Sequence, residues 1–156
     1  MIILGIDPGT AITGCGIIEK VPNGLKLIDY SCIRTDKNHS TAERLKEIDQ
    51  QLAKIIRKYN PQKIAVEDIF FFKNLKTAVK VSQARGVILA RAARANKQVQ
   101  EYTPLQVKQA VSSYGRADKT QVQKMVKLLL RLEEIPKPDD AADALAVAIC
   151  CANSTK

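Results

Sequence analysis

Short apolar runs with polar ends divide the first part of the chain into predicted strands. Residues 2–6 are continuously apolar, which is typical of a buried strand. Residues 13–19 and 25–35 are also strand-like, and the sequence Pro-Asn-Gly at 22–24 joins them. An Asn-Gly turn between two such segments indicates an antiparallel hairpin. We therefore expect one strand followed by a β-hairpin.

A helical repeat of apolar residues follows the hairpin. Ser40 and Glu43 have the spacing of a capping box, in which two side chains satisfy backbone N–H groups at a helix start. Asn60-Pro61 ends the pattern. The apolar positions recur every three or four residues, as one face of a helix requires: Leu45, Ile48, Leu52, Ile55, Ile56 and Tyr59.

The remainder of the chain alternates strand-like and helical segments. The predicted strands are at 64–67 and 98–102. The predicted helices are at 74–95, 119–132 and 139–152, and a further helix starts at 103–104 and ends at a polar break at 112–118. Thr-Pro at 103–104 favours a helix start because Pro is well tolerated in the first turn. This order predicts a mixed sheet covered by helices. We expect one α/β domain over residues 1–156, a length sufficient for one core.

Composition narrows the class of protein. The chain is 46% hydrophobic and 26% charged, as in ordinary globular proteins. Its apolar runs are shorter than the roughly 18 residues that a membrane span needs, and the N-terminus lacks a basic leader. The four cysteines show no C-x-x-C spacing. We therefore expect reduced thiols and a cytoplasmic protein that has no membrane partner.

The positive charge is concentrated in one part of the chain. Residues 1–72 contain 10 Lys and Arg and 9 Asp and Glu, whereas residues 73–131 contain 13 basic residues and only Glu101 and Asp118 as acids. A block of one sign fits contact with a polyanion, whose phosphates such residues neutralise. A solvated basic surface is the alternative explanation.

Four carboxylates stand at the ends of apolar elements. Asp7 follows the first strand and Glu67 ends the strand at 64–67, while Asp140 and Asp143 open the final helix. Alternate strand residues share a face, so only one of Glu67 and Asp68 can face a given site. Residues three apart lie on one helix face. The carboxyl ends of strands are also where open α/β sheets bind ligands.

Each acid also has an ordinary structural explanation, because Asp7 can satisfy the turn that follows it and Asp139 or Asp140 can cap a helix. The coincidence of four, beside a basic block, favours a metal site. Carboxylate oxygens favour Mg²⁺, with Mn²⁺ as a substitute, over zinc. Two ions about 3.5–4 Å apart can activate water and stabilise a leaving oxygen. Phosphodiester hydrolysis is the reaction class we infer.

The motifs around these acids resemble RuvC-type Holliday-junction resolvases, or crossover junction endodeoxyribonucleases, of the RNase H-like superfamily. The resemblance covers nearly the whole chain. Its fold would be a mixed five-stranded sheet, with three antiparallel strands continued by parallel ones and helices on both faces. The motifs are Gly5-Ile6-Asp7-Pro8-Gly9, Ala65-Val66-Glu67, Gln83-Ala84-Arg85-Gly86 and Asp140-Ala141-Ala142-Asp143-Ala144-Leu145-Ala146.

The resemblance implies that Asp7, Glu67, Asp140 and Asp143 are the catalytic, metal-binding set, with Asp139 left as a helix cap. It implies a homodimer that nicks two opposed strands of a four-way junction in recombination and repair. The small-residue helix at 74–95 is a candidate place for two subunits to meet. Branch-migration motor proteins are partners by family analogy alone.

Several residues are candidate DNA contacts. The resemblance places a base-stacking aromatic at Phe70, although aromatic residues more often fill cores. Three basic residues flank the polar segment at 112–115, and the resemblance supports two of them, Lys108 and Lys119; for any single one, ordinary surface charge is the alternative. The full set is Phe70, Lys76, Arg85, Lys108, Arg116 and Lys119.

Other functions fit part of the pattern. A related RNase H-like nuclease that processes ribosomal-RNA precursors would share the chemistry, whereas a non-catalytic junction-binding protein would not need all four acids. The sequence at 6–10, Ile-Asp-Pro-Gly-Thr, also resembles the first phosphate motif of sugar kinases and actin-like ATPases. Those proteins need a second lobe and a second Gly-rich loop, which this sequence does not show.

Overall fold

The computed structural model describes residues 1–68 and 75–155, and of residues 75 and 76 only the backbone. Phe70 therefore lies outside the described residues, as does the side chain of Lys76. All ten predicted strands and helices are present. They are β1 (Ile2–Asp7), β2 (Ile12–Val21), β3 (Gly24–Arg34), α1 (Thr41–Tyr59), β4 (Lys63–Glu67), α2 (Leu75–Arg94), β5 (Gln98–Tyr102), α3 (Pro104–Ser112), α4 (Lys119–Leu129) and α5 (Asp139–Ser154).

The strands form one mixed sheet in the order β3-β2-β1-β4-β5. The pairs β1–β2 and β2–β3 are antiparallel, whereas β1–β4 and β4–β5 are parallel. Three antiparallel strands are thus continued by parallel ones, as expected. The hairpin is longer than its apolar pattern predicts, because pairing continues through polar residues from Ile12 to Arg34.

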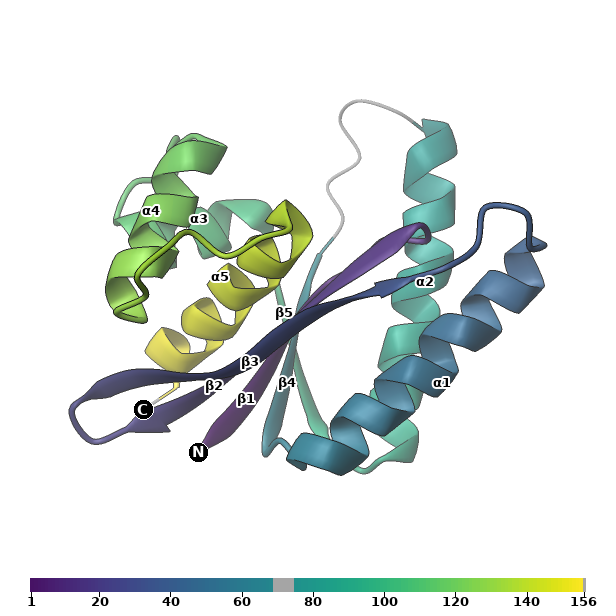
Figure 1. The fold of residues 1–156 in the computed structure, drawn as a ribbon, viewed down its shortest axis with the longest axis horizontal. Coiled ribbons are helices and arrows are strands. Elements are labelled where there is room, and N and C mark those ends of the chain that lie inside the picture. The colour runs from purple at the N-terminus through teal and green to yellow at the C-terminus, as the bar shows by residue number, and fades with distance from the viewer. Residues whose placement is uncertain (69–74, 156) are drawn as a thin grey trace.

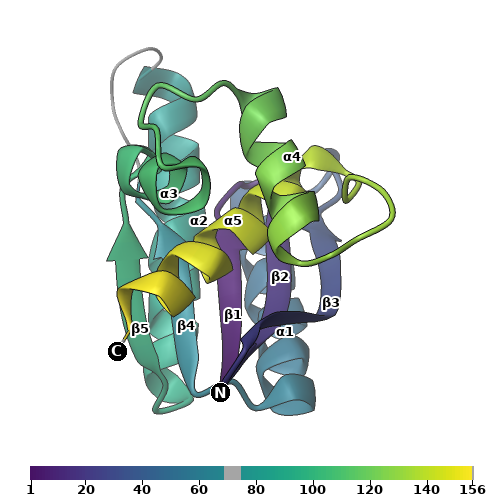
Figure 2. The same cartoon turned by 90° about the vertical axis from the view of Figure 1, so that its left-hand side faces the viewer.

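Helices cover both faces of this sheet, which confirms the expected α/β architecture (Figure 1). Helices α1 and α2 pack on one face and bury Leu4 and Ile6 of β1. Helices α3, α4 and α5 cover the other face, where Ile3 and Ala65 are buried (Figure 2). Strand parity therefore distributes the apolar residues between two cores.

Helix α5 lies directly against the backbone of β1 and β2. A Cβ atom on Gly14 would lie 1.9 Å from the carbonyl oxygen of Asp140, and one on Gly5 would lie 2.2 Å from that of Ala144. Gly16 pairs with Gly5 across the two strands, and a Cβ atom there would lie 2.7 Å from the backbone nitrogen of Leu145. These contacts leave no room for side chains, so the three glycines set how closely α5 approaches the sheet.

Capping boxes satisfy the starts of three helices whose caps lie within the described residues. The predicted box of α1 is present, and α3 and α4 have boxes of their own. At α5 the prediction that Asp139 is the cap is wrong. Pro138 occupies the cap position without a side-chain hydrogen bond, and Asp139 is already helical. The carboxylate of Asp139 instead forms an ion pair with Lys119.

Substitution of Gly14 tests the close approach of α5. We expect Gly14→Ala to lower the free energy of unfolding in urea by about 1–3 kcal/mol, because its methyl group overlaps the α5 backbone. Gly86→Ala is the matched control, since a Cβ there meets nothing within 4 Å. Alanine in this helix should stabilise by about 0.5–1 kcal/mol. Equal unfolding midpoints for Gly14→Ala and wild type would contradict the packing described above.

Candidate active site

Asp7 and Glu67 meet at one edge of the sheet. Strands β1 and β4 are parallel neighbours with Ile6 opposite Val66, so the acid that follows each of these residues lies at the same edge. Asp7 shares the strand face of Gly5, and Glu67 shares that of Ala65, which packs in the α5 core. The two carboxyl groups lie close enough for each to shift the pKa of the other.

The neighbouring Asp68 belongs to the opposite face of the sheet. Its carboxylate lies 3.1 Å from the guanidinium of Arg85 on α2, which also pairs with Glu101. This arrangement agrees with the strand parity that favoured Glu67 over Asp68. It also places Arg85 away from the α5 face on which Asp7 and Glu67 lie.

Helix α5 supplies the other two acids. Asp7 pairs across the sheet with Gly14, and the backbone of Asp140 lies directly over Gly14. The first turn of α5 is therefore held above the end of β1. Asp143, one turn further along, faces the same site and lines a pocket together with Glu67. The structure thus brings together all four acids that the sequence singles out.

Burial and mutual repulsion disfavour ionisation of this set. Burial and, to a smaller extent, the charges of Glu67, Asp143 and Asp140 together raise the pKa of Asp7 to about 8. Burial also raises the pKa of Glu67 to about 7, aided by Asp143. The pKa of Asp143 is raised by burial, against the opposing effect of Lys119. An added cation would relieve this repulsion.

The donor set fits a hard divalent cation. Carboxylate oxygens are the ligands that Mg²⁺ prefers. As they stand, no three acidic, His or Cys side chains in the described parts of the chain are arranged to hold a metal ion. A bound cation would draw these carboxylates closer together, because it would relieve their mutual repulsion.

Two predicted basic residues lie beside the acids. The ammonium of Lys119 is 3.0 Å from Asp143, and the charge of Lys108 lowers the pKa of Glu67. Both lysines line the pocket that contains Glu67 and Asp143. Arg116 is exposed in the α3–α4 connection and has no ion pair within residues 1–68 and 75–155. Neither Arg85 nor Arg116 is brought to the acids.

Sequence reasoning missed Cys32. This residue pairs with Gly14 across the hairpin, and the charges of Asp140 and Asp7, secondary to burial, raise the pKa of its thiol. The backbone of Ala141 has a smaller, opposite effect on this pKa. The signal available was the hairpin register, since any residue opposite Gly14 must lie beside the start of α5.

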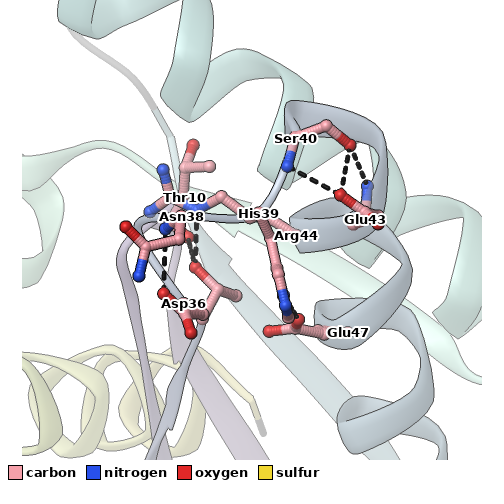
Figure 3. Close-up of polar contacts among 9 residues, drawn as sticks. Thr10, Asp36, Asn38, His39, Ser40, Glu43, Arg44 and Glu47 are labelled. Carbon is pink, nitrogen blue, oxygen red and sulfur yellow. Dashed lines mark hydrogen bonds and ion pairs between the residues drawn. The ribbon is translucent and has the colours of Figure 1, made fainter.

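A polar network also fixes the turn that follows Asp7. The hydroxyl of buried Thr10 donates to the Lys80 carbonyl on α2 at 2.7 Å. Thr35 donates to the Thr10 carbonyl at 2.7 Å, and Arg44 of α1 donates to Thr35 at 2.8 Å. Figure 3 shows Thr10 and Arg44 in this network, with His39 pairing with Glu47 at its periphery. The turn that follows Asp7 is thus bonded directly to α2 and to the residue after β3, and through Thr35 to α1.

Comparison with known proteins identifies the family. The family model of the crossover junction endodeoxyribonuclease RuvC matches residues 3–151. RuvC of Halothermothrix orenii is 58% identical over 154 residues, which cover 99% of this chain and 93% of that protein. The chain belongs to the RuvC family. This assignment confirms the predicted family, the enzyme class and the junction-directed nuclease function.

Solved structures of the RuvC family share the fold. The structure of Thermus thermophilus RuvC has a TM-score of 0.89 at 35% identity, covering 98% of this chain and 94% of that one. The same protein in complex with a Holliday junction substrate also has a TM-score of 0.89, at 32% identity and the same coverage. In the described part of the present chain, no helix is both long and apolar enough to cross a membrane.

The raised pKa of Asp7 predicts how stability depends on pH. The pKa of Asp7 is about 8 in the folded protein, whereas the ordinary pKa of an aspartate is 3.8. Between these pH values the folded state therefore binds more protons than the unfolded state. The free energy of unfolding contributed by Asp7 therefore falls as pH rises through this window. Without metal, we expect Asp7→Asn to raise the Tm by about 3–8 °C near pH 8.5, with little change below about pH 4.

This expectation is checked by thermal unfolding in a chelator across that pH range. Asp68→Asn is the control, because Asp68 lies on the opposite face and pairs with Arg85. A Tm difference for Asp7→Asn that does not change with pH would show that Asp7 ionises normally in the folded protein.

Proposed function

We propose that this chain cleaves four-way DNA junctions at divalent metal ions held by Asp7, Glu67, Asp140 and Asp143. The observation that carries the proposal is the convergence of four carboxylates from β1, β4 and α5 on one site, where burial and their own charges raise the pKa values of Asp7 and Glu67. A site of this kind is unfavourable for the free protein and favours a cation. The T. thermophilus relative seen with a Holliday junction substrate supports the substrate class.

Mg²⁺ is the proposed cofactor, with Mn²⁺ as a substitute and two ions per site. Bound metal would activate a water and stabilise the leaving oxygen of the scissile phosphodiester. The charges of the three other acids all act on Asp7, which supports it as the ligand shared between ions. Lys108 and Lys119 lie beside the acids and would face the anionic phosphate.

The paired, symmetric nicks of this proposal need two active sites related by a two-fold axis, so we propose a homodimer. Arg116 and Lys76 are proposed to contact the junction backbone, and Phe70 to stack on an unpaired base. Arg85 stays a prediction with less support, because it pairs with Asp68 and Glu101. A single nuclease domain acting in the cytoplasm, with motor proteins as partners, completes the proposal.

The alternative functions have less support. A non-catalytic junction-binding protein would gain nothing from bringing together four carboxylates whose charges repel one another. Processing of ribosomal-RNA precursors would use the same chemistry, but the curated relatives are named as endodeoxyribonucleases. Substrate selectivity separates this second alternative from junction cleavage.

Conservative substitution of the acids tests the metal site. Asp7→Asn, Glu67→Gln, Asp140→Asn and Asp143→Asn should each lower the single-turnover rate of Mg²⁺-dependent junction nicking by about 10³-fold or more, since each removes a charged ligand. Junction affinity measured in a chelator should change by less than about fivefold. Asp68→Asn, adjacent in sequence to Glu67, should cut at the wild-type rate. Normal cutting by any of the four variants would remove that residue from the proposed ligand set.

Substrate comparison tests the proposed selectivity. With Mg²⁺ present, wild-type protein should make paired nicks in a synthetic four-way junction and leave duplex DNA, single-stranded DNA and structured RNA intact. A chelator should abolish the nicks while binding persists. Preferential cleavage of the RNA would favour the precursor-processing alternative, and binding without cleavage at any Mg²⁺ concentration would favour the non-catalytic one.

A further inference from the structure

A single ammonium group bridges two carboxylates on α5. Lys119 is the first residue of α4, and its Nζ lies 3.0 Å from Oδ2 of Asp143 and 3.3 Å from Oδ2 of Asp139. Asp139 and Asp143 are one helical turn apart, so they present neighbouring carboxylates to α4. Figure 2 shows α4 beside the start of α5. The two ion pairs differ in surroundings, because Asp143 is 29% exposed and Asp139 is 61% exposed.

The backbone positions of this bridge are fixed. The side chain of Asp118 accepts from the Gln121 N–H at 2.8 Å, and Gln121 accepts from the Asp118 N–H at 2.9 Å, so the start of α4 is capped. The start of α5 is held over Gly14. Lys119 can therefore change partners by rotation of its side chain alone, without movement of either helix.

Metal binding creates a conflict at Asp143. If Asp143 is a metal ligand, a divalent cation and the Lys119 ammonium compete for the same carboxylate, and the two positive charges repel each other. Asp139 offers the ammonium a second partner at nearly the same distance, and its carboxylate is more exposed to solvent than that of Asp143. A free lysine on a four-carbon stem would otherwise lose its orientation.

We propose that Asp139 is a positioning residue that retains the Lys119 ammonium beside the active site when a cation occupies Asp143. The proposal rests on the proposed metal site. Asp139 then has two effects: it reduces the competition between Lys119 and the metal for Asp143, and it holds the ammonium where the scissile phosphate arrives. The alternative is that Asp139 only adds favourable charge to the first turn of α5.

A double-mutant cycle separates these two roles. Mg²⁺ affinity is measured by calorimetry for Asp139→Asn in the wild-type background and in a Lys119→Met background, at constant pH and ionic strength. With Lys119 present, Asp139→Asn should weaken Mg²⁺ binding about threefold or more, because the ammonium is left to compete at Asp143. Without Lys119 the same substitution should change the affinity by less than about 1.5-fold. An equal loss in both backgrounds, or none in either, would overturn the proposal.

Cleavage provides a second readout. Asp139→Asn should lower the single-turnover nicking rate at saturating junction and Mg²⁺ by about tenfold, with KM for the junction changed less than about twofold. Asp139→Glu should restore most of the rate because it returns a carboxylate to Lys119. Glu134→Gln, which removes an exposed acid of the preceding loop, is the charge control and should match wild type. A loss of thermal stability without a loss of rate would indicate a purely structural role.

Asp143→Asn distinguishes failure of the proposal from failure of the metal site. If Asp143→Asn leaves Mg²⁺ affinity unchanged, the proposed ligand set is wrong. If Asp143→Asn greatly weakens Mg²⁺ binding while Asp139→Asn acts equally with and without Lys119, the metal site stands and only the positioning role of Asp139 fails.

Discussion

The close contact between α5 and the two central antiparallel strands is the constraint on which the active site depends. Gly5, Gly14 and Gly16 leave the sheet without side chains where the helix crosses it, so backbone meets backbone. Asp7 lies at the end of the same surface, opposite Gly14. The contact therefore does two things at once: it buries the alanine-rich side of α5 and carries Asp140 and Asp143 to the end of β1.

Bringing the acids together has an electrostatic cost, which accounts for the position of Lys119 and for the expected affinity for a cation. Burial and neighbouring charges raise the pKa values of Asp7 and Glu67, so the unliganded set resists ionisation. Lys119 offsets part of this cost through its contact with Asp143. A lysine can do so only partially, since it delivers one charge at the edge of the set. A divalent cation would deliver more charge at its centre, which is why stability without metal and affinity for metal are linked here.

The spacing of residues near one another in sequence predicts the strands, the helices and the four acids, because these depend on strand alternation and helix periodicity. Strand parity separated Glu67 from Asp68, and helix spacing paired Asp140 with Asp143. Pattern failed where the outcome depends on elements far apart in sequence. The approach of α5 to Gly14 and Gly16 has no signal in either segment alone. For the same reason the sequence predicts Asp139 as a helix cap, since its partner Lys119 is on another helix.

The basic residues between 73 and 131 are a further case in which the sequence pattern does not show the tertiary contacts. Their ion pairs indicate on which surface we expect DNA to lie. Arg85 pairs with Asp68 and Glu101, and Arg91 and Arg94 pair with Asp49 on α1. Much of the positive charge on α2 is therefore neutralised by ion pairs within the protein. Lys108 and Lys119 lie on the other face, beside the acids, where Lys119 pairs with Asp139 and Asp143. Arg116 lies exposed in the connection between their helices and has no ion pair within residues 1–68 and 75–155. Charge that is not neutralised internally is what attracts a polyanion. The surface formed by α3, α4 and their connection is accordingly where we expect the phosphate backbone to approach the proposed metal site.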